Sequence, residues 1–296
     1  MRHPTRDRCA LCLREANLEQ SHIVPKFVFR WLKQTSATGK FRRSNAVNVR
    51  VQDGVTHRLL CRACEQRLGA WEAKFASLFF RPILDGGDVP FRVDYEEWMF
   101  MCVLSISFRA VALQMRSSTP RREHHRLLIE AVLDEWRHAL LSDPCRETVS
   151  EHHVFVLSPV EEDPPGEQLP DSLNWYWMRS VDLTLAFCGD KTAFSYVKLP
   201  GMVILSGILP ATIEGMDGTR VRLRGRMAAP QSILNSEIGE FVVLTRPREA
   251  MPIFEGISSS QRAVIDRAYD AARGKWESLP SFAAGHSDFL LQRRRK

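Results

Sequence analysis

The sequence has few cysteines, no apolar leader and no long hydrophobic run. Seven cysteines in 296 residues are too few, and too unevenly spaced, for the disulfide framework of a secreted protein. The first eight residues are polar and basic and no apolar stretch follows them, so we expect no secretory leader. The most apolar stretch, residues 98–108, is too short to cross a bilayer and predicts a buried helix. These absences favour a cytoplasmic protein with no membrane segment.

The length and composition are those of a globular protein that can hold two domains. The chain is 44% hydrophobic and 26% charged, and it has neither an internal repeat nor a long low-complexity tract. A turn-rich segment at 84–90 predicts a domain boundary, with one module at residues 1–80 and a second domain at residues 85–296. Residues 1–75 hold 15 Lys and Arg against 6 Asp and Glu, while the remainder is slightly acidic. This asymmetry favours a polyanionic partner for the first module, although a merely soluble basic surface would look the same.

Four of the cysteines form two C-x-x-C pairs, Cys9 with Cys12 and Cys61 with Cys64. Each pair holds two sulfurs on one tight turn, and two such pairs can close a tetrahedral zinc site. Four thiolates fill the coordination sphere, so the expected zinc is structural rather than catalytic. A redox role is the alternative, but neither pair lies in a recognisable redox context.

The segment between the two pairs carries a histidine on an apolar, strand-like stretch, Ser21-His22-Ile23-Val24-Pro25. A short helix is expected near residues 27–33, and a β-hairpin turning at Asp53-Gly54 is expected between residues 48–52 and 55–61. After the second pair, apolar residues recur at helical spacing and predict a helix from residue 65 to about 78. The module should therefore present His22 on a scaffold held together by zinc.

This order of features, over residues 9 to about 75, resembles the HNH branch of the His-Me finger nucleases. The resemblance implies a zinc-stapled ββα module in which His22 activates water and the helix after the second pair supplies ligands to one divalent metal, Mg²⁺ or Mn²⁺. Where the family has a metal ligand before the histidine and an imidazole after the second knuckle, this chain has Ser21 and Glu65. Glu72 shares the helical face of Glu65.

The resemblance gives a set of candidate site residues. The catalytic candidates are His22, Glu65, Glu72 and Asn48. The family's middle asparagine has no unambiguous match, because Asn45 and Asn48 both precede the expected hairpin and Gln52 and Asp53 mark its turn. The alternative is a purely structural role: His22 would be a hydrogen-bonded core residue, and Glu65 and Glu72 would be exposed helix charges that pair with their neighbours. The candidate nucleic-acid-binding residues are Lys26, Arg42, Arg43 and Arg50.

The second domain is expected to be a mixed helical and β-rich unit of unknown role, which makes the whole chain α+β. We expect helices at about 95–116 and from Thr119-Pro120 to residue 141, strands within 153–227, and a last helix from residue 258 to about 276. The doublets His124-His125 and His152-His153 lack ligand partners at suitable spacing and are interpreted as surface residues. This domain could bind a protein partner or assemble an oligomer.

Together these patterns predict a metal-dependent endonuclease that hydrolyses phosphodiester bonds in DNA, with a role as an effector in bacterial defence permitted by the resemblance. The main alternative is a catalytically degenerate, zinc-stapled module that binds nucleic acid. A third is a zinc-dependent protein-interaction module whose basic face contacts an acidic protein.

Overall fold

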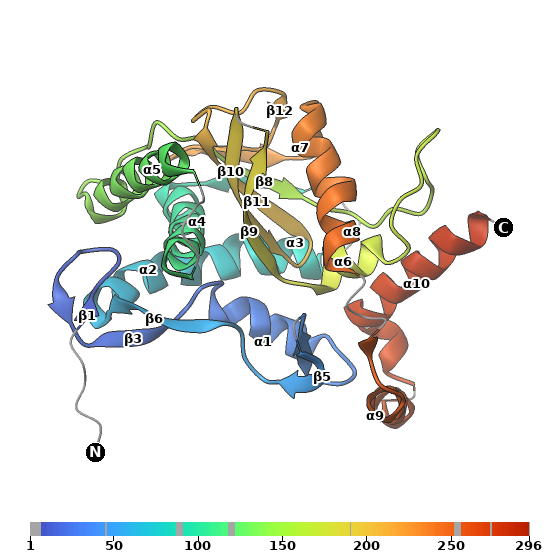
Figure 1. Cartoon of the computed structure of the whole chain (residues 1–296). Coiled ribbons are helices and arrows are strands. Elements are labelled where there is room, and N and C mark those ends of the chain that lie inside the picture. Colours follow the sequence, from blue (N-terminus) through green and yellow to red (C-terminus); the bar gives the residue numbers. More distant parts are fainter. Residues whose placement is uncertain are drawn as a thin grey trace, which may run out of the picture.

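The computed structural model describes residues 7–44, 46–86, 91–117, 122–189, 191–251, 256–272 and 274–295. The chain is a mixed α+β protein in which a cysteine-containing N-terminal part lies beside a five-stranded sheet and its helices (Figure 1). The strands are β1 Asp7–Arg8, β2 Glu15–Ala16, β3 Leu18–His22, β4 Phe41–Arg43, β5 Ala46–Val51, β6 Thr56–Cys61, β7 Arg92–Tyr95, β8 His152–Val156, β9 Asp182–Cys188, β10 Thr192–Leu199, β11 Met202–Leu209, β12 Met216–Asp217, β13 Arg220–Val221, β14 Gly225–Ala228 and β15 Ser232–Ile233. The helices are α1 Lys26–Gln34, α2 Arg62–Phe75, η1 Ala76–Phe80, α3 Arg81–Asp85, α4 Glu97–Ser117, α5 Glu123–Leu141, α6 Leu173–Arg179, α7 Ser236–Glu240, η2 Phe241–Thr245, α8 Arg246–Ala250, α9 Ser259–Ala271, η4 Trp276–Ser278 and α10 Pro280–Arg294.

In the N-terminal part, β3 and β6 form an antiparallel pair and α2 follows β6 directly. The pairing places Leu18 opposite Cys61 and His22 opposite Thr56. Leu59 and Leu60 are fully buried, and α2 packs against both strands and against α4. This strand pair and the helix after it bring the two C-x-x-C pairs together.

The expected hairpin across Asp53-Gly54 is wrong. β5 pairs with β4 and β6 pairs with β3, so the Asp-Gly turn joins two different sheets. Burial explains the choice, because pairing with β3 brings the two cysteine pairs together and covers the apolar end of β6, whereas β5 has no fully buried residue. Gly54 is still required at the turn, since the ring of Phe29 lies 2.1 Å from where a Cβ would stand.

The five-stranded sheet is antiparallel, in the order β13-β8-β11-β10-β9, and both of its faces are covered. Along β11, Met202 and Ile204 belong to the core beneath α4 and α5, while Val203 and Leu205 belong to a second core with α6, α7 and η2. Alternate side chains of a strand point to opposite faces, so a strand buried on both sides is apolar throughout. In Figure 1 the sheet lies between α4 and α5 on one side and α7 and α8 on the other.

The expected helices near 27–33, 65–78, 95–116 and 120–141 are present, although Thr119 and Pro120 lie outside the described residues. Residues 175–179, predicted to begin a strand over 175–186, lie in helix α6. The helices from α7 to α8 and α10 were not predicted. The surface interpretation of three histidines is wrong: His152 and His153 are almost completely buried and His125 stacks on Phe187. Strand β8 is interior to the sheet, so its polar side chains are buried with it.

One continuous core joins the N-terminal part to the helices and sheet beyond residue 90. It runs from Cys9 and Leu68 to Phe108 and Ile204, so the boundary predicted between residues 80 and 85 does not separate two cores. Helix α4 has the length and apolar composition of a membrane span, but 83% of its most apolar window is buried inside the protein. It is the helix on which both parts pack.

Candidate metal centre and the surrounding polar site

The four predicted cysteines lie together. Their sulfurs are all within 4.8 Å of one another, and the Cys12 and Cys61 sulfurs are 3.8 Å apart. A tetrahedral zinc with bonds of about 2.3 Å requires sulfurs separated by about 3.8 Å, so the donor set fits the ion. Cys9, Cys12, Cys61 and Cys64 are therefore placed to hold a metal ion such as zinc.

Local backbone structure aims each cysteine pair inward. The short β1–β2 ribbon closes around the first pair, with Cys9 N–H donating to the carbonyl of Arg14 and Leu13 N–H donating to that of Cys9. The turn needs a left-handed residue after Cys12, and Leu13 supplies it at φ 60° despite its side chain. The second pair is held where β6 becomes α2, and the Cys61 N–H points at the Cys9 sulfur, 3.3 Å away.

Hydrogen bonds favour the thiolate at Cys9. The Cys64 thiol and backbone N–H groups of the two cysteine turns lower the pKa of Cys9 to about 4, although burial opposes them. The same contact with Cys9 raises the pKa of Cys64. Backbone N–H donors to sulfur are the kind of outer contact that orients the ligands of a metal.

His22, at the end of β3, faces an acidic partner that sequence reasoning did not assign. Its Nε2 lies 3.0 Å from Oδ1 of Asp53, on the turn between β5 and β6. The His22 side chain is 19% exposed and that of Asp53 44% exposed. Partial burial raises the pKa of Asp53, but the N–H of Gly54, the His22 ring and the charge of Lys26 together lower it below its ordinary value. Nε2 is buried and forms no hydrogen bond with a described residue, so the contact with Asp53 is a close approach of two ionisable groups.

A buried arginine fixes the backbone at His22. Arg109 of α4 is 1% exposed, and its Nη1 donates to the carbonyl oxygen of His22 at 2.9 Å. Its Nη2 forms an ion pair with the carboxylate of Glu72, and its Nε donates to the carbonyl of Ser105. One guanidinium thus ties the end of β3, helix α2 and helix α4 together. Glu72 lies next to His22 through this arginine, with one carboxylate oxygen already bound.

The other two residues aligned with family metal ligands face away from solvent. Ser21 is buried, and its hydroxyl accepts a hydrogen bond from the N–H of Leu60, so it secures the β3–β6 pair. One carboxylate oxygen of Glu65 is buried with no hydrogen-bond partner among the described residues. A cleft between α1 and α2 is lined by Glu72 but by neither Glu65 nor His22.

Residues on the β4–β5 ribbon have mainly structural partners. The side chain of Asn48 donates to the carbonyl of Gly256 and accepts from the N–H of Ser258, which pins the start of α9. Arg42 donates to the carbonyl of Val47 and to Gln261 of α9. Arg43 is exposed, as is Arg50, which faces Arg42 across the ribbon. Asn45 lies outside the described residues.

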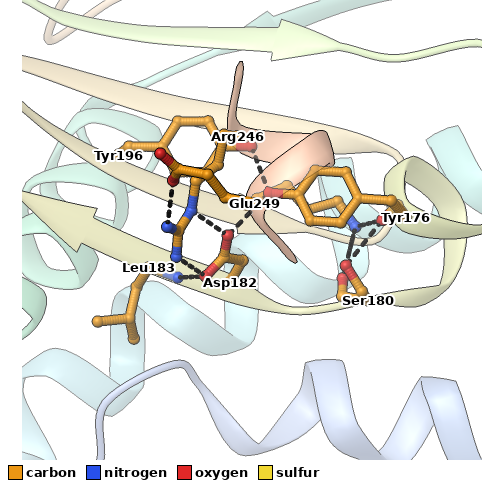
Figure 2. A network of polar contacts seen from close by, with 8 residues as sticks. Tyr176, Ser180, Asp182, Leu183, Tyr196, Arg246 and Glu249 are labelled. Carbon is orange, nitrogen blue, oxygen red and sulfur yellow. Dashed lines mark hydrogen bonds and ion pairs between the residues drawn. The ribbon is translucent and has the colours of Figure 1, made fainter. Parts of the chain in front are cut away.

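A second polar cluster, on the far side of the sheet, is closed on itself (Figure 2). Arg246 donates twice to the carboxylate of Asp182, at 2.6 and 2.8 Å, and Tyr176 donates to the same carboxylate at 2.8 Å. Burial lowers the pKa of Lys198 well below its ordinary value, and its Nζ donates to the carbonyl and hydroxyl of Ser180. Such mutually bonded groups hold the sheet and its helices together.

Asp53 is the functional candidate that sequence reasoning missed. It was assigned to a hairpin turn, and its contact with His22 follows only from the pairing of β6 with β3. Pairing Thr56 with His22 places the turn three residues earlier beside the histidine. Among the described residues, the four cysteines are the only group of three or more His, Cys, Asp or Glu side chains close enough to share a metal ion.

Comparisons of the chain with models of known protein families, with curated proteins and with solved structures give no match.

Proposed function

We propose that the chain is a metal-dependent nuclease of the HNH type, which hydrolyses phosphodiester bonds in DNA with His22 as the general base. The observation that carries the proposal is the His22–Asp53 pair at the end of β3, on a ββα unit whose two cysteine pairs converge. A histidine oriented by a carboxylate is a common arrangement for proton transfer near neutral pH.

The two ring nitrogens of His22 have different roles in this proposal. Nε2 is buried 3.0 Å from the Asp53 carboxylate, so Nδ1 is the nitrogen left to accept a proton from water. The water oxygen then bonds to phosphorus, the bond from phosphorus to the leaving sugar oxygen breaks, and the proton remains on His22. Arg109 contributes by holding the backbone of His22, and therefore the position of the ring.

A bound Mg²⁺ or Mn²⁺ would neutralise charge that builds up on the phosphate and the leaving oxygen. Such ions are often held by one or two carboxylates, with substrate phosphates and water completing the shell. Asp53 is the exposed carboxylate nearest the histidine that the structure offers for this role. Glu72 contributes only through the oxygen that Arg109 leaves free, and Glu65 stays a predicted ligand.

The test compares zinc-loaded wild-type protein with three purified variants in plasmid cleavage, with Mg²⁺, with Mn²⁺ or with EDTA. His22→Ala should lower the cleavage rate by about 10²-fold or more, while zinc content and DNA binding persist, because a general base acts on the reaction. Asp53→Asn should lower it as well. His57→Ala is the matched control, since His57 is exposed on the partner strand opposite Ser21. Cleavage by His22→Ala at the wild-type rate would contradict the assignment.

A second candidate function is DNA binding without cleavage. It is favoured by Glu72, whose carboxylate is paired with Arg109, and by the absence of a second group of three metal-ligating side chains among the described residues. Its signature would be zinc-loaded wild-type protein that binds DNA and leaves it intact with every divalent ion tested.

A further inference from the structure

A cleft of about 360 Å³ opens between α1 and α2. Lys26 and Glu72 line it, one from each helix. The positive charge of Lys26 lowers the pKa of Asp53, and Glu72 shares Arg109 with the backbone of His22. Neither His22 nor Asp53 lines the cleft, which is connected to that pair only through Lys26 and Glu72.

Small side chains on α2 keep the cleft open. Gly69, Ala73 and Ala76 recur at helical spacing along its wall. A Cβ added at Gly69 would meet no atom within 4 Å. A polymer can thus approach the helix closely along this face.

The charged groups around the cleft are predominantly positive. Lys26 and Arg30 lie one turn apart on α1, and Arg81, at the start of α3, lines the same space. All three are exposed, and none makes a hydrogen bond or ion pair with another described residue. The single carboxylate, Glu72, is neutralised from behind by Arg109. Three cations with no internal partner thus surround one concave surface.

We propose that this cleft binds a nucleic-acid strand through its backbone phosphates, with Arg30, Arg81 and Lys26 as the phosphate contacts. Arginine recognises phosphate through paired hydrogen bonds, and a positively charged groove that follows the backbone is the usual way to hold a strand without reading its sequence. The choice of nucleic acid rests on the proposed function, whereas the phosphate chemistry rests on the cleft itself. A strand held here would lie against Lys26 and Glu72, the two lining residues that interact with Asp53 and with Arg109.

The first test measures binding of a fluorescein-labelled DNA duplex by full-length, zinc-loaded protein with no Mg²⁺ or Mn²⁺ added, where no cleavage is expected, over a range of KCl concentrations. The double variant Arg30→Ala/Arg81→Ala should weaken binding by about tenfold or more, because each charge-assisted contact is lost. The slope of log Kd against log salt should fall by about 2, since each duplex phosphate contact contributes about 0.9. The control is Arg62→Ala/Lys74→Ala, which removes the same charge from exposed positions of α2 outside the cleft.

A second pair of variants adds charge without removing a contact. Gly69→Glu places a carboxylate in the cleft, so it should weaken binding of DNA. The protein should remain folded, because the substitution replaces a helical glycine where a Cβ meets no atom within 4 Å. Ala70→Glu adds the same charge at the next, exposed residue outside the cleft, and should have a much smaller effect.

Equal losses in the cleft variants and their controls would show a response to overall charge and overturn the proposal. So would unchanged binding in the cleft variants. Because binding is measured without Mg²⁺ or Mn²⁺, a protein that never cleaves DNA but loses affinity in the cleft variants would refute the nuclease assignment and leave the cleft proposal standing. If DNA cleavage depends on His22 but the cleft variants bind DNA as the wild type does, the cleft proposal is refuted and the nuclease assignment stands.

Discussion

The surroundings of β3, β6 and α1 differ from those of the five-stranded sheet in what their polar side chains do. Around the sheet, polar groups are bonded to one another: Asp182 with Arg246 and Tyr176 (Figure 2), and His152 with Ser206 and Thr148. Around α1, the cations Lys26 and Arg30 have no partner among the described residues, and His22 and Asp53 are partly exposed.

The difference shows where a ligand can be recognised. A buried polar group costs free energy unless it is hydrogen-bonded, so these bonds support the sheet region, where Ser195 Oγ and His153 Nε2 are buried without a partner among the described residues. Groups at a cleft pay a smaller penalty in water and stay available. The sheet region therefore has a structural role. Arg109 on α4, which packs on that region, holds the backbone of His22 by a hydrogen bond.

The largest effect should come from the cysteine cluster, which has no counterpart in the sheet region. Cys61→Ser should lower the free energy of unfolding by about 4 kcal/mol or more and abolish stoichiometric zinc binding, because a tetrahedral site loses one of four ligands. Metal analysis and urea unfolding would measure both. Hydrogen exchange should show β3, β6 and α2 opening before β10 and β11.

Cys145→Ser is the control for that change, since Cys145 is a half-buried cysteine outside the cluster. Full zinc content in Cys61→Ser, or equal loss of zinc in the control, would refute the predicted metal site.

A smaller effect is expected where the two regions meet. Arg109→Met should lower the free energy of unfolding by about 3 kcal/mol, because it leaves the Glu72 carboxylate without its buried partner. The double variant Arg109→Met/Glu72→Leu should recover part of this loss, which a double-mutant cycle would measure. Arg226→Met, which breaks an exposed pair with Asp94, is the control and should change stability little. Additive effects of Arg109 and Glu72 would contradict the coupling.

The smallest effect should appear as pH dependence from the sheet region. Burial lowers the pKa of His152 to about 3 and that of His153 to about 4. Below pH 6.5 these histidines are protonated in the unfolded chain but stay neutral in the folded protein. The free energy of unfolding therefore falls as the pH falls from 6.5 towards 4 and 3. Asp288 acts in the opposite direction, because burial raises its pKa to about 6 and the folded state takes up a proton first. The net loss between pH 7 and pH 5 should be about 2 kcal/mol.

Urea unfolding at several pH values would measure this loss, and His152→Gln should reduce its slope. His57→Gln, at an exposed position in the N-terminal part, should not. A His152→Gln protein with the wild-type slope would show that acid destabilises the protein elsewhere.

The cysteine cluster was predictable because the residues that form it follow a short sequence pattern. Two C-x-x-C pairs specify donor type and number in a few residues each, and the strong apolar periodicity of α2 and α4 predicted those helices. The candidates assigned by family position fared differently. Glu72 lies beside His22, but Asn48 is hydrogen-bonded to the segment before α9, and Glu65 does not line the cleft.

The sequence by itself determined the four candidate metal-binding cysteines, the histidine between them and the basic charge of the first 75 residues, because these depend on residue type and short spacing. Only the tertiary structure decided that β6 pairs with β3, that Asp53 meets His22, and that Arg109 binds both Glu72 and the backbone of His22. Those contacts join residues up to 87 positions apart. Their choice depends on which pairing buries the most apolar surface while satisfying each buried polar group, and that balance is a property of the whole fold.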